Sequence, residues 1–300
     1  MVERNVRTAR GEHVDGAHRD PVLRLTVLGS GTLVADGRRG PAGYAMEHGA
    51  TRLVLDGGTG TLRRLAEMGI DYRSIDHLLY THVHPDHTGD LVPFLFAQRH
   101  TPGFERRRAL RLSGPRGFAA FVRQLLAIYG RWVESPDYAI QVEEHWGDAF
   151  EIAALAITTA RMRHPVACIG YRLTAPDGSS IAYTGDTDAT DGIVELAADV
   201  DVLVADCSTP DAGKVEGHLS PGPLGELAQA AGARRLVLSH LYPVCDGADL
   251  VGECRRHFRG EVLVAHDGLV VEVAARRVTV SVQPIQVWPT GLEPQGGATR

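Results

Sequence analysis

The sequence predicts an α/β fold, a four-layer αββα sandwich in which two β-sheets pack face to face between layers of helices. Short runs of β-branched residues alternate with amphipathic stretches along the chain, which indicates strands interspersed with helices. The expected strands outnumber the helices, and tight Gly, Pro and Asp turns separate many of them. This combination is typical of two packed sheets with helices outside.

Each half of the chain contributes strands and helices in alternation. In the first half we expect strands at Leu23–Leu28, Thr51–Leu55, Leu78–Thr81 and Leu110–Ser113, and helices at Leu62–Met68 and Phe118–Tyr129. In the second half we expect strands at Ala156–Ala160, Ile169–Thr174, Ile181–Thr184, Val202–Ala205, Leu236–Ser239, Val262–Val264 and Val270–Val273. The helices of that half are expected at Ile193–Ala198, Leu224–Ala231 and Ala248–Phe258.

The two ends of the chain differ from its middle. Residues 1–20 are polar without hydrophobic periodicity, and residues 284–300 are rich in Pro, Gly and Thr, so we expect both to be flexible tails. No Pro/Ser linker divides the part between them, and no exact repeat is visible. We therefore expect one domain at residues 21–283.

The overall charge and the cysteines exclude several classes of protein. The 300 residues carry a formal net charge of -6, and the only basic run, Arg106-Arg107-Arg108, is interpreted as a solvated face, which disfavours nucleic acid as the main partner. No stretch approaches the ~18 consecutive apolar residues of a membrane span, and the start lacks the apolar core of a signal peptide. The four cysteines form no Cys-x-x-Cys pair. We expect reduced thiols in a cytoplasmic protein without membrane contact.

One segment concentrates metal-ligating side chains. His82, His84, Asp86 and His87 lie within six residues, directly after the apolar strand at 78–81. Residues two apart at a strand end point the same way, so His82 and His84 can bind one ion together. A single histidine is usually a core or surface residue, but three imidazoles and a carboxylate this close would repel on protonation and cost desolvation if buried without a cation.

This segment resembles the metallo-β-lactamase superfamily, whose signature is His-x-His-x-Asp-His. The resemblance covers about Leu23–Val282, and the later ligands of that family match residues that each follow an expected strand: His164, Asp186 and His240. It implies that His82, His84 and His164 hold a first ion, that Asp86, His87 and His240 hold a second, and that Asp186 bridges them. Two Zn²⁺ ions are expected, with Mn²⁺ or Fe²⁺ as alternatives for the same nitrogen and oxygen ligands.

The reaction expected from such a centre is hydrolysis. Two ions about 3.5–4 Å apart lower the pKa of a bridging water and supply hydroxide at neutral pH, and Asp86 belongs to this reacting centre. The turns Gly29-Ser30-Gly31 and Asp56-Gly57-Gly58 are weak signals; the first has no P-loop lysine after it and is interpreted as an ordinary turn without a catalytic role.

A second motif concerns the substrate. Asp206-Cys207-Ser208, followed by Gly217-His218-Leu219-Ser220, resembles the paired acid and His-Ser motif of ribonuclease Z. The resemblance implies that His218 protonates the leaving oxygen while Asp206 fixes its tautomer; Glu216 is a rival partner. The alternative is that His218 only occupies the loop before a helix that Ser220 and Pro221 start, but capping accounts for Ser220 and not for His218.

The chain departs from ribonuclease Z in one region. Only 21 residues separate His164 from Asp186, and they read as a hairpin of Cys168–Thr174 and Ser180–Thr184, with no room for the long basic tRNA-binding arm of that family. We therefore expect a phosphodiesterase for a small or cyclic phosphodiester, with a homodimer suggested by the resemblance. The alternatives are an acyl hydrolase for a lactone, thioester or β-lactam, an RNA-processing endonuclease of the ribonuclease Z type, and a non-catalytic scaffold.

Overall fold

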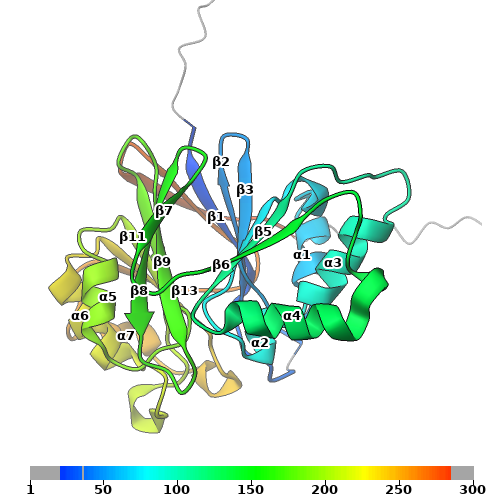
Figure 1. Cartoon of the computed structure of the whole chain (residues 1–300). Coiled ribbons are helices and arrows are strands. Elements are labelled where there is room, and N and C mark those ends of the chain that lie inside the picture. The colour runs from blue at the N-terminus through cyan, green and yellow to red at the C-terminus, as the bar shows by residue number, and fades with distance from the viewer. Residues whose placement is uncertain (1–20, 36, 285–300) are drawn as a thin grey trace, which may run out of the picture.

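Two β-sheets form the centre of the molecule, for which a computed structural model describes residues 21–35 and 37–284. The first sheet has eight strands in the order β15-β14-β1-β2-β3-β4-β5-β6, and the second has seven in the order β13-β12-β11-β10-β9-β8-β7. Helices α1, α3 and α4 cover the outer face of the first sheet, and α5, α6 and α7 cover the second (Figure 1). This is the predicted αββα sandwich.

The bounds of the elements follow the chain in order. The strands of the first sheet are β1 (Leu23–Gly29), β2 (Gly43–His48), β3 (Thr51–Gly57), β4 (His77–Leu79), β5 (Leu110–Gly114), β6 (Ile140–Glu144), β14 (Leu269–Ala274) and β15 (Arg277–Val282). Those of the second are β7 (Ala149–Ile152), β8 (Leu155–Met162), β9 (Cys168–Thr174), β10 (Ser180–Tyr183), β11 (Val202–Asp206), β12 (Arg235–Ser239) and β13 (Glu261–Val264). The α-helices are α1 (Thr61–Glu67), α2 (Pro85–Thr88), α3 (Leu91–His100), α4 (Phe118–Tyr129), α5 (Asp191–Leu196), α6 (Pro221–Ala231) and α7 (Leu250–Arg255).

Alternation along the strands builds the core on both faces of each sheet. In β11, Val202 and Val204 pack between the two sheets, whereas Leu203 and Ala205 pack under the helices of the second sheet. Apart from its last residue, Asp206, this strand is apolar because both of its faces are covered, as buried parallel strands usually are. It could therefore be recognised from the sequence as a continuous apolar run.

The parallel part of each sheet determines where polar residues gather. β3, β4, β5 and β6 run parallel, as do β10, β11, β12 and β13, with helices in the connections between them. The carboxyl ends of parallel strands meet at one edge of a sheet, and ligands bind there in open α/β sheets. In Figure 1 this is the lower end, where α2 follows β4.

Several sequence predictions need correction. Strands β2, β6, β7 and β15 and helix α3 were not expected, and the expected strand at 78–81 ends at Leu79. Arg106 is not on a solvated face: it is 4% exposed, donates to the carbonyl oxygen of Ile75 at 2.7 Å and pairs with Asp76. Its cation thus ties the loop before β5 to the loop before β4. The expected tails lie mostly outside the described residues, which end at residue 284.

The start of α6 shows another difference. Ser220 and Pro221 occupy the positions expected for the N-cap and the first turn, but the side chain of Ser220 makes no capping hydrogen bond. The Oδ1 atom of Asp211 accepts the amide proton of Gly222 at 2.8 Å instead. All four cysteines are free and buried.

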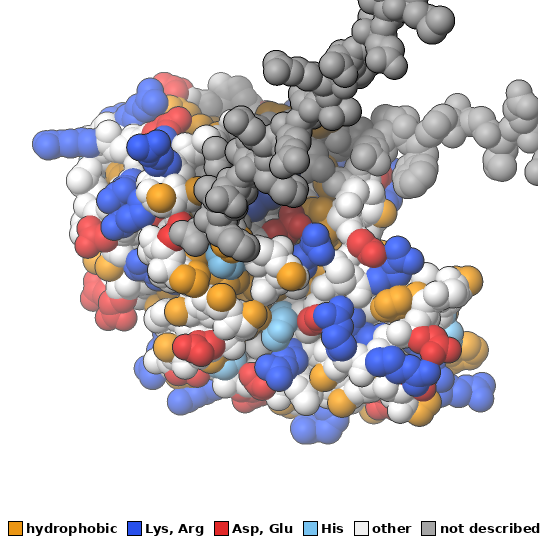
Figure 2. Space-filling model, turned by 90° about the horizontal axis from the view of Figure 1, so that it is seen from above, with side chains coloured by type: hydrophobic (Ala, Val, Ile, Leu, Met, Phe, Trp, Pro, Cys, Tyr) orange, Lys and Arg blue, Asp and Glu red, His pale blue; other side chains and the backbone are white. Residues whose placement is uncertain are grey.

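The end of the sandwich opposite α2 carries charges of both signs. On the part of this face that is not covered by grey atoms in Figure 2, Lys and Arg side chains are interspersed with Asp and Glu instead of gathering in one basic patch. Among the described residues, no helix is long and apolar enough to pass through a bilayer.

Candidate metal centre

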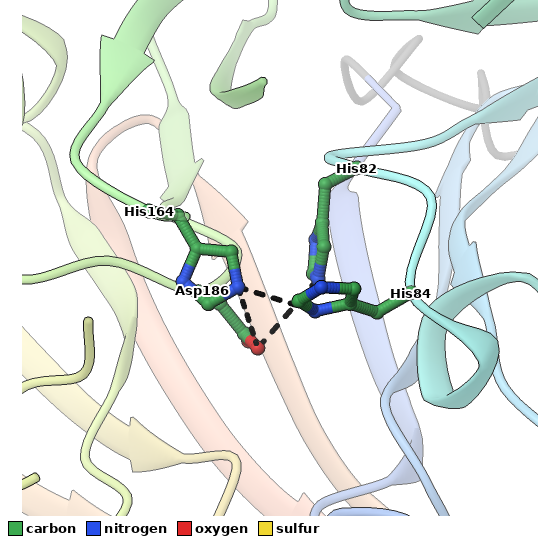
Figure 3. Close-up of side chains that lie close together, drawn as sticks. All are labelled: His82, His84, His164 and Asp186. Atoms are coloured by element: carbon green, nitrogen blue, oxygen red, sulfur yellow. Dashed lines mark hydrogen bonds and ion pairs between the residues drawn. The ribbon is translucent and has the colours of Figure 1, made fainter. Parts of the chain in front are cut away.

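Seven predicted ligands converge at the lower end of the two sheets. His82 and His84 follow β4, Asp86 and His87 lie on the short helix α2, and His164 follows β8. Asp186 follows β10 and His240 follows β12. The two sheets thus contribute from opposite sides: in Figure 3, His82 and His84 extend from the loop after β4 toward His164 and Asp186 on the side of the other sheet.

The first group of ligand atoms comes from His82, His84, His164 and Asp186. These atoms all lie within 4.8 Å of one another. Nε2 of His164 lies 3.2 Å from Nδ1 of His84 and 3.9 Å from Oδ2 of Asp186 (Figure 3). His84 therefore presents Nδ1 where His164 presents Nε2, and one cation between them would have four donor atoms, the number that zinc prefers.

The second group consists of Asp86, His87 and His240, with Asp186 again at its edge. Nε2 of His240 lies 3.4 Å from Oδ2 of Asp86 and 3.4 Å from Oδ1 of Asp186. Nε2 of His87 lies 3.2 Å from the same Oδ1. One oxygen of Asp186 therefore faces each group, which is the arrangement that a bridging carboxylate requires.

The hydrogen bonds of the imidazoles leave the converging nitrogens free. Buried Nε2 atoms of His82, His87 and His240 and Oδ1 of Asp186 have no hydrogen-bond partner within the described residues. Buried polar atoms are normally paired, so a cluster of four unpaired ones needs an explanation. Burial lowers the pKa of His82 well below its usual value and lowers that of His164, which keeps both in the neutral form that binds cations. The donor set fits metal ions.

The opposite ring nitrogens are fixed by other groups of the chain. Nδ1 of His87 donates to Asp56 at 2.8 Å, and Nδ1 of His164 donates to the carbonyl oxygen of Gly217 at 2.9 Å. Nδ1 of His240 lies 3.0 Å from Oγ of Ser208. Such partners set the tautomer and the orientation of a metal-binding imidazole.

Asp56 is a site residue that sequence reasoning missed. Its carboxylate is 1% exposed and accepts hydrogen bonds from the backbone and hydroxyl of Thr81, from His87 and from the hydroxyl of Tyr183, each at 2.8 Å. Its φ of 52° lies in the left-handed region, which Asp tolerates better than most residues. The only signal for it in the sequence was an aspartate before Gly57-Gly58 at the end of a strand. The turn therefore has a role in the site, because its aspartate orients the predicted ligand His87.

The predicted acid lies beside the second group. Nδ1 of His218 donates to Oδ2 of Asp206 at 2.9 Å, and its ring stacks on that of His240 with centroids 5.3 Å apart. Burial opposes protonation of His218, but the hydrogen bond and the charge of Asp206 outweigh it and raise the pKa above the usual value. Glu216 lines a neighbouring pocket, and the partner in the structure is Asp206.

Asp188 lies two residues after Asp186 and holds the loop that carries His218 in place. Oδ2 of Asp188 accepts the amide proton of Gly217 at 3.1 Å, and Oδ1 pairs with Lys214 at 2.9 Å. Because the carbonyl of the same Gly217 orients His164, one peptide unit connects a predicted ligand to the predicted acid. Asp188 and Gly217 were not recognised from the sequence.

A two-sheet sandwich that brings five histidines and two aspartates together at its strand ends defines the class of metallo-hydrolases with the metallo-β-lactamase fold. Residues 42–241 match the family model of the beta-lactamase superfamily domain. The chain belongs to this superfamily, whose members generally bind metal ions.

Individual relatives agree with this assignment. The chain is 35% identical over 247 residues to the uncharacterized protein Rv1339 of Mycobacterium tuberculosis, covering 80% of this chain and 88% of that protein. It is 26% identical over 261 residues to the probable metallo-hydrolase YhfI of Bacillus subtilis, covering 83% of this chain and 100% of YhfI. The crystal structure of YhfI has a TM-score of 0.72 over 85% of this chain and 100% of that chain. Human tRNase Z, short form, shares the fold with a TM-score of 0.67 at 21% identity, covering 82% of this chain and 98% of that one.

Proposed function

We propose that this chain is a dinuclear zinc-dependent phosphodiesterase that acts on a small or cyclic phosphodiester. The observation that carries the proposal is the Asp206–His218 pair beside the two ligand groups, with 15% of the His218 side chain exposed. A thioester expels a thiolate, which needs no such acid; a lactone also expels an alkoxide, and against it stands the resemblance of this pair to the acid and His-Ser motif of ribonuclease Z. The pair thus favours a reaction in which an alkoxide must be protonated as it leaves.

The two groups of ligands would hold one ion each. His82, His84 and His164 belong to the first site, and Asp86, His87 and His240 to the second, with Asp186 shared between them. When bound, the ions would supply Lewis acidity for the phosphate and activate water at neutral pH. Mn²⁺ or Fe²⁺ would suit the same donors.

The chain itself would supply the proton and hold it in place. Oδ2 of Asp206 also accepts the amide proton of Thr187 at 3.0 Å, and Oδ1 accepts the hydroxyl proton of Ser208 at 2.6 Å, so the carboxylate cannot rotate freely. With Nδ1 of His218 donating to this fixed oxygen, Nε2 carries the proton that would pass to the leaving oxygen.

A small substrate is favoured over folded RNA, although Ribonuclease Z of Haloarcula marismortui is 26% identical over 308 residues. Between His164 and Asp186 the chain forms only the antiparallel hairpin β9–β10. Binding of a folded RNA normally relies on many Lys and Arg contacts with phosphate, and the net charge is -6. Cytoplasmic location, which four free cysteines favour, and a homodimer remain parts of the proposal.

Turnover of bis(p-nitrophenyl) phosphate by zinc-loaded protein tests this function. For thymidylyl-thymidine, whose leaving group is an alkoxide, His218→Asn should lower kcat about 10²–10⁴-fold, the usual range for loss of a general acid, while metal analysis still finds both ions. Release of p-nitrophenolate, which leaves without being protonated, should fall much less. His257→Asn is the matched control, because His257 pairs with Glu226 in the outer helical layer. Full turnover of thymidylyl-thymidine by His218→Asn, or cleavage of lactones and thioesters with inert phosphodiesters, would contradict the proposal.

A further inference from the structure

A pocket of about 380 Å³ opens beside the metal centre and has no role in the chemistry described so far. It is lined by Arg163, His164, Pro165, Asp188, Glu216 and Gly217. Its volume falls in the range of about 300–1,000 Å³ that small-molecule sites occupy. Two of the lining residues belong to the neighbouring centre: His164 is a predicted ligand, and Gly217 precedes the predicted acid, His218.

The geometry of the shared wall joins the pocket to the reacting centre. Nε2 of His164 faces Asp186 and His84, while its Nδ1 is held by the carbonyl of Gly217. Gly217 has a φ of +86°, and a Cβ there would lie 3.2 Å from Cδ of Pro165. Glycine is thus required at this point of the wall, since any other side chain would be strained and crowded against it.

The charges that line the pocket are opposite and do not neutralise each other. Asp188 is already satisfied by Lys214, by the amide of Gly217 and by the amide of Ala189. Arg163 and Glu216 are both exposed, and in the part of the chain that the structure describes neither side chain forms an ion pair. One free cation and one free anion therefore face the same space.

This charge pattern selects among the groups that a phosphodiester can carry. A second phosphate would be attracted by Arg163 but repelled by Glu216. An alkyl or aromatic group would remove water from both charges without replacing its hydrogen bonds, which is costly. An uncharged group with several donors and acceptors would satisfy both, because it can donate to the carboxylate and accept from the guanidinium.

We propose that this pocket is a substrate subsite for one of the two ester groups of the phosphodiester, and that the group is an uncharged, multiply hydrogen-bonding one of sugar or nucleoside size. The inference rests on the proposed phosphodiesterase function and deepens it. Arg163 and Glu216 are specificity residues in this proposal, and the reacting atoms are left to the neighbouring centre.

Two substrates separate the subsite from the reaction. Bis(p-nitrophenyl) phosphate carries two aromatic ester groups, whereas thymidylyl-thymidine carries a nucleoside on either side of the phosphate. We expect the ratio of kcat/KM for thymidylyl-thymidine to kcat/KM for bis(p-nitrophenyl) phosphate to fall about tenfold in Glu216→Gln, which removes the charge of the acceptor, and in Arg163→Met, which removes the charged donor. Both side chains are exposed, so both variants should fold.

A matched pocket elsewhere supplies the control. Arg161 and Glu195 line a cavity of about 390 Å³ that includes none of the predicted ligands. Glu195→Gln should leave the substrate ratio at the wild-type value. A ratio within twofold of wild type in either Glu216→Gln or Arg163→Met would overturn the subsite. Failure of the wild-type protein to cleave either substrate would instead overturn the proposed function itself.

Discussion

The two ends of strand β11 bury an aspartate each, and the two are compensated in different ways. At the start, Asp201 accepts the amide proton of Ser180 at 2.9 Å and pairs with Arg276 at 3.1 Å and Arg234 at 3.4 Å. At the other end, the partners of Asp206 are the amide of Thr187, the hydroxyl of Ser208 and the imidazole of His218. At the first end, arginine side chains supply permanent positive charge. At the second end, His218 carries a positive charge only when it is protonated.

The difference separates a structural charge from a functional one. A buried carboxylate next to guanidinium groups is neutralised by the chain itself, because arginine stays protonated. Near Asp206, Oδ1 of Asp186 and the Nε2 atoms of His82, His87 and His240 have no hydrogen-bond partner within the described residues, so a cation from outside the chain would have to compensate them. The same strand therefore has a closed end at Asp201, where the chain itself compensates the charge, and an open end at Asp206, where neighbouring ligand atoms are left unpaired.

The largest expected effect is the response to metal removal. If cations complete the open end, chelation should abolish turnover and lower the free energy of unfolding by about 4 kcal/mol where free metal had been about 1,000-fold above its Kd. Thermal unfolding with and without chelator, followed by readdition of Zn²⁺, measures both effects. If the midpoint temperature of unfolding is the same with and without chelator, cations do not stabilise the open end and the proposed difference between the two ends is wrong.

A smaller effect is expected at the closed end. Asp201→Asn should lower the free energy of unfolding by about 2 kcal/mol, less than the ~3–5 kcal/mol of a fully buried pair because Arg276 and Arg234 are partly exposed. Urea denaturation measures the loss, and kcat of the zinc-loaded variant should equal that of wild type. Reduced metal content in this variant would show that the two ends are coupled.

The smallest effect is expected at Asp188, which holds the loop that carries His218 in place. Asp188→Ala removes the acceptor of the Gly217 amide and should reduce kcat about tenfold with both metals retained, the lower end of the range for residues that orient ligands. Lys214→Met removes only the ion pair and keeps that acceptor, so its effect should be smaller. Equal rates for Asp188→Ala and wild type would show that the loop needs no such anchor.

Local patterns explain why most of the centre was predictable. His82, His84, Asp86 and His87 lie on one strand end and one helical turn, so their spacing alone places their side chains together. His164, Asp186 and His240 were located through the resemblance to the metallo-β-lactamase superfamily, and the strand that precedes each of them agreed with it. Asp56 lies 31 positions before its partner His87, and no periodicity connects the two.

The missed elements show where tertiary context overrides local preference. Strand β2 contains Ala45, Met46 and Glu47, which favour helices, yet it pairs with β1 and β3 on its two sides. Helix α3 begins with a proline in its first turn and continues as an apolar run around Phe94, which periodicity alone does not distinguish from a buried strand. Such segments adopt their structure because of their neighbours.

The backbone at His240 limits how this centre can be redesigned. Its φ of 57° lies in the left-handed region, where Gly, Asn and Asp are tolerated and bulky or β-branched residues are strained. Of these three, aspartate offers a charged oxygen within the same backbone conformation. If the centre binds zinc as proposed, His240→Asp is the substitution at this position that would shift its affinity toward harder ions such as manganese without straining the backbone.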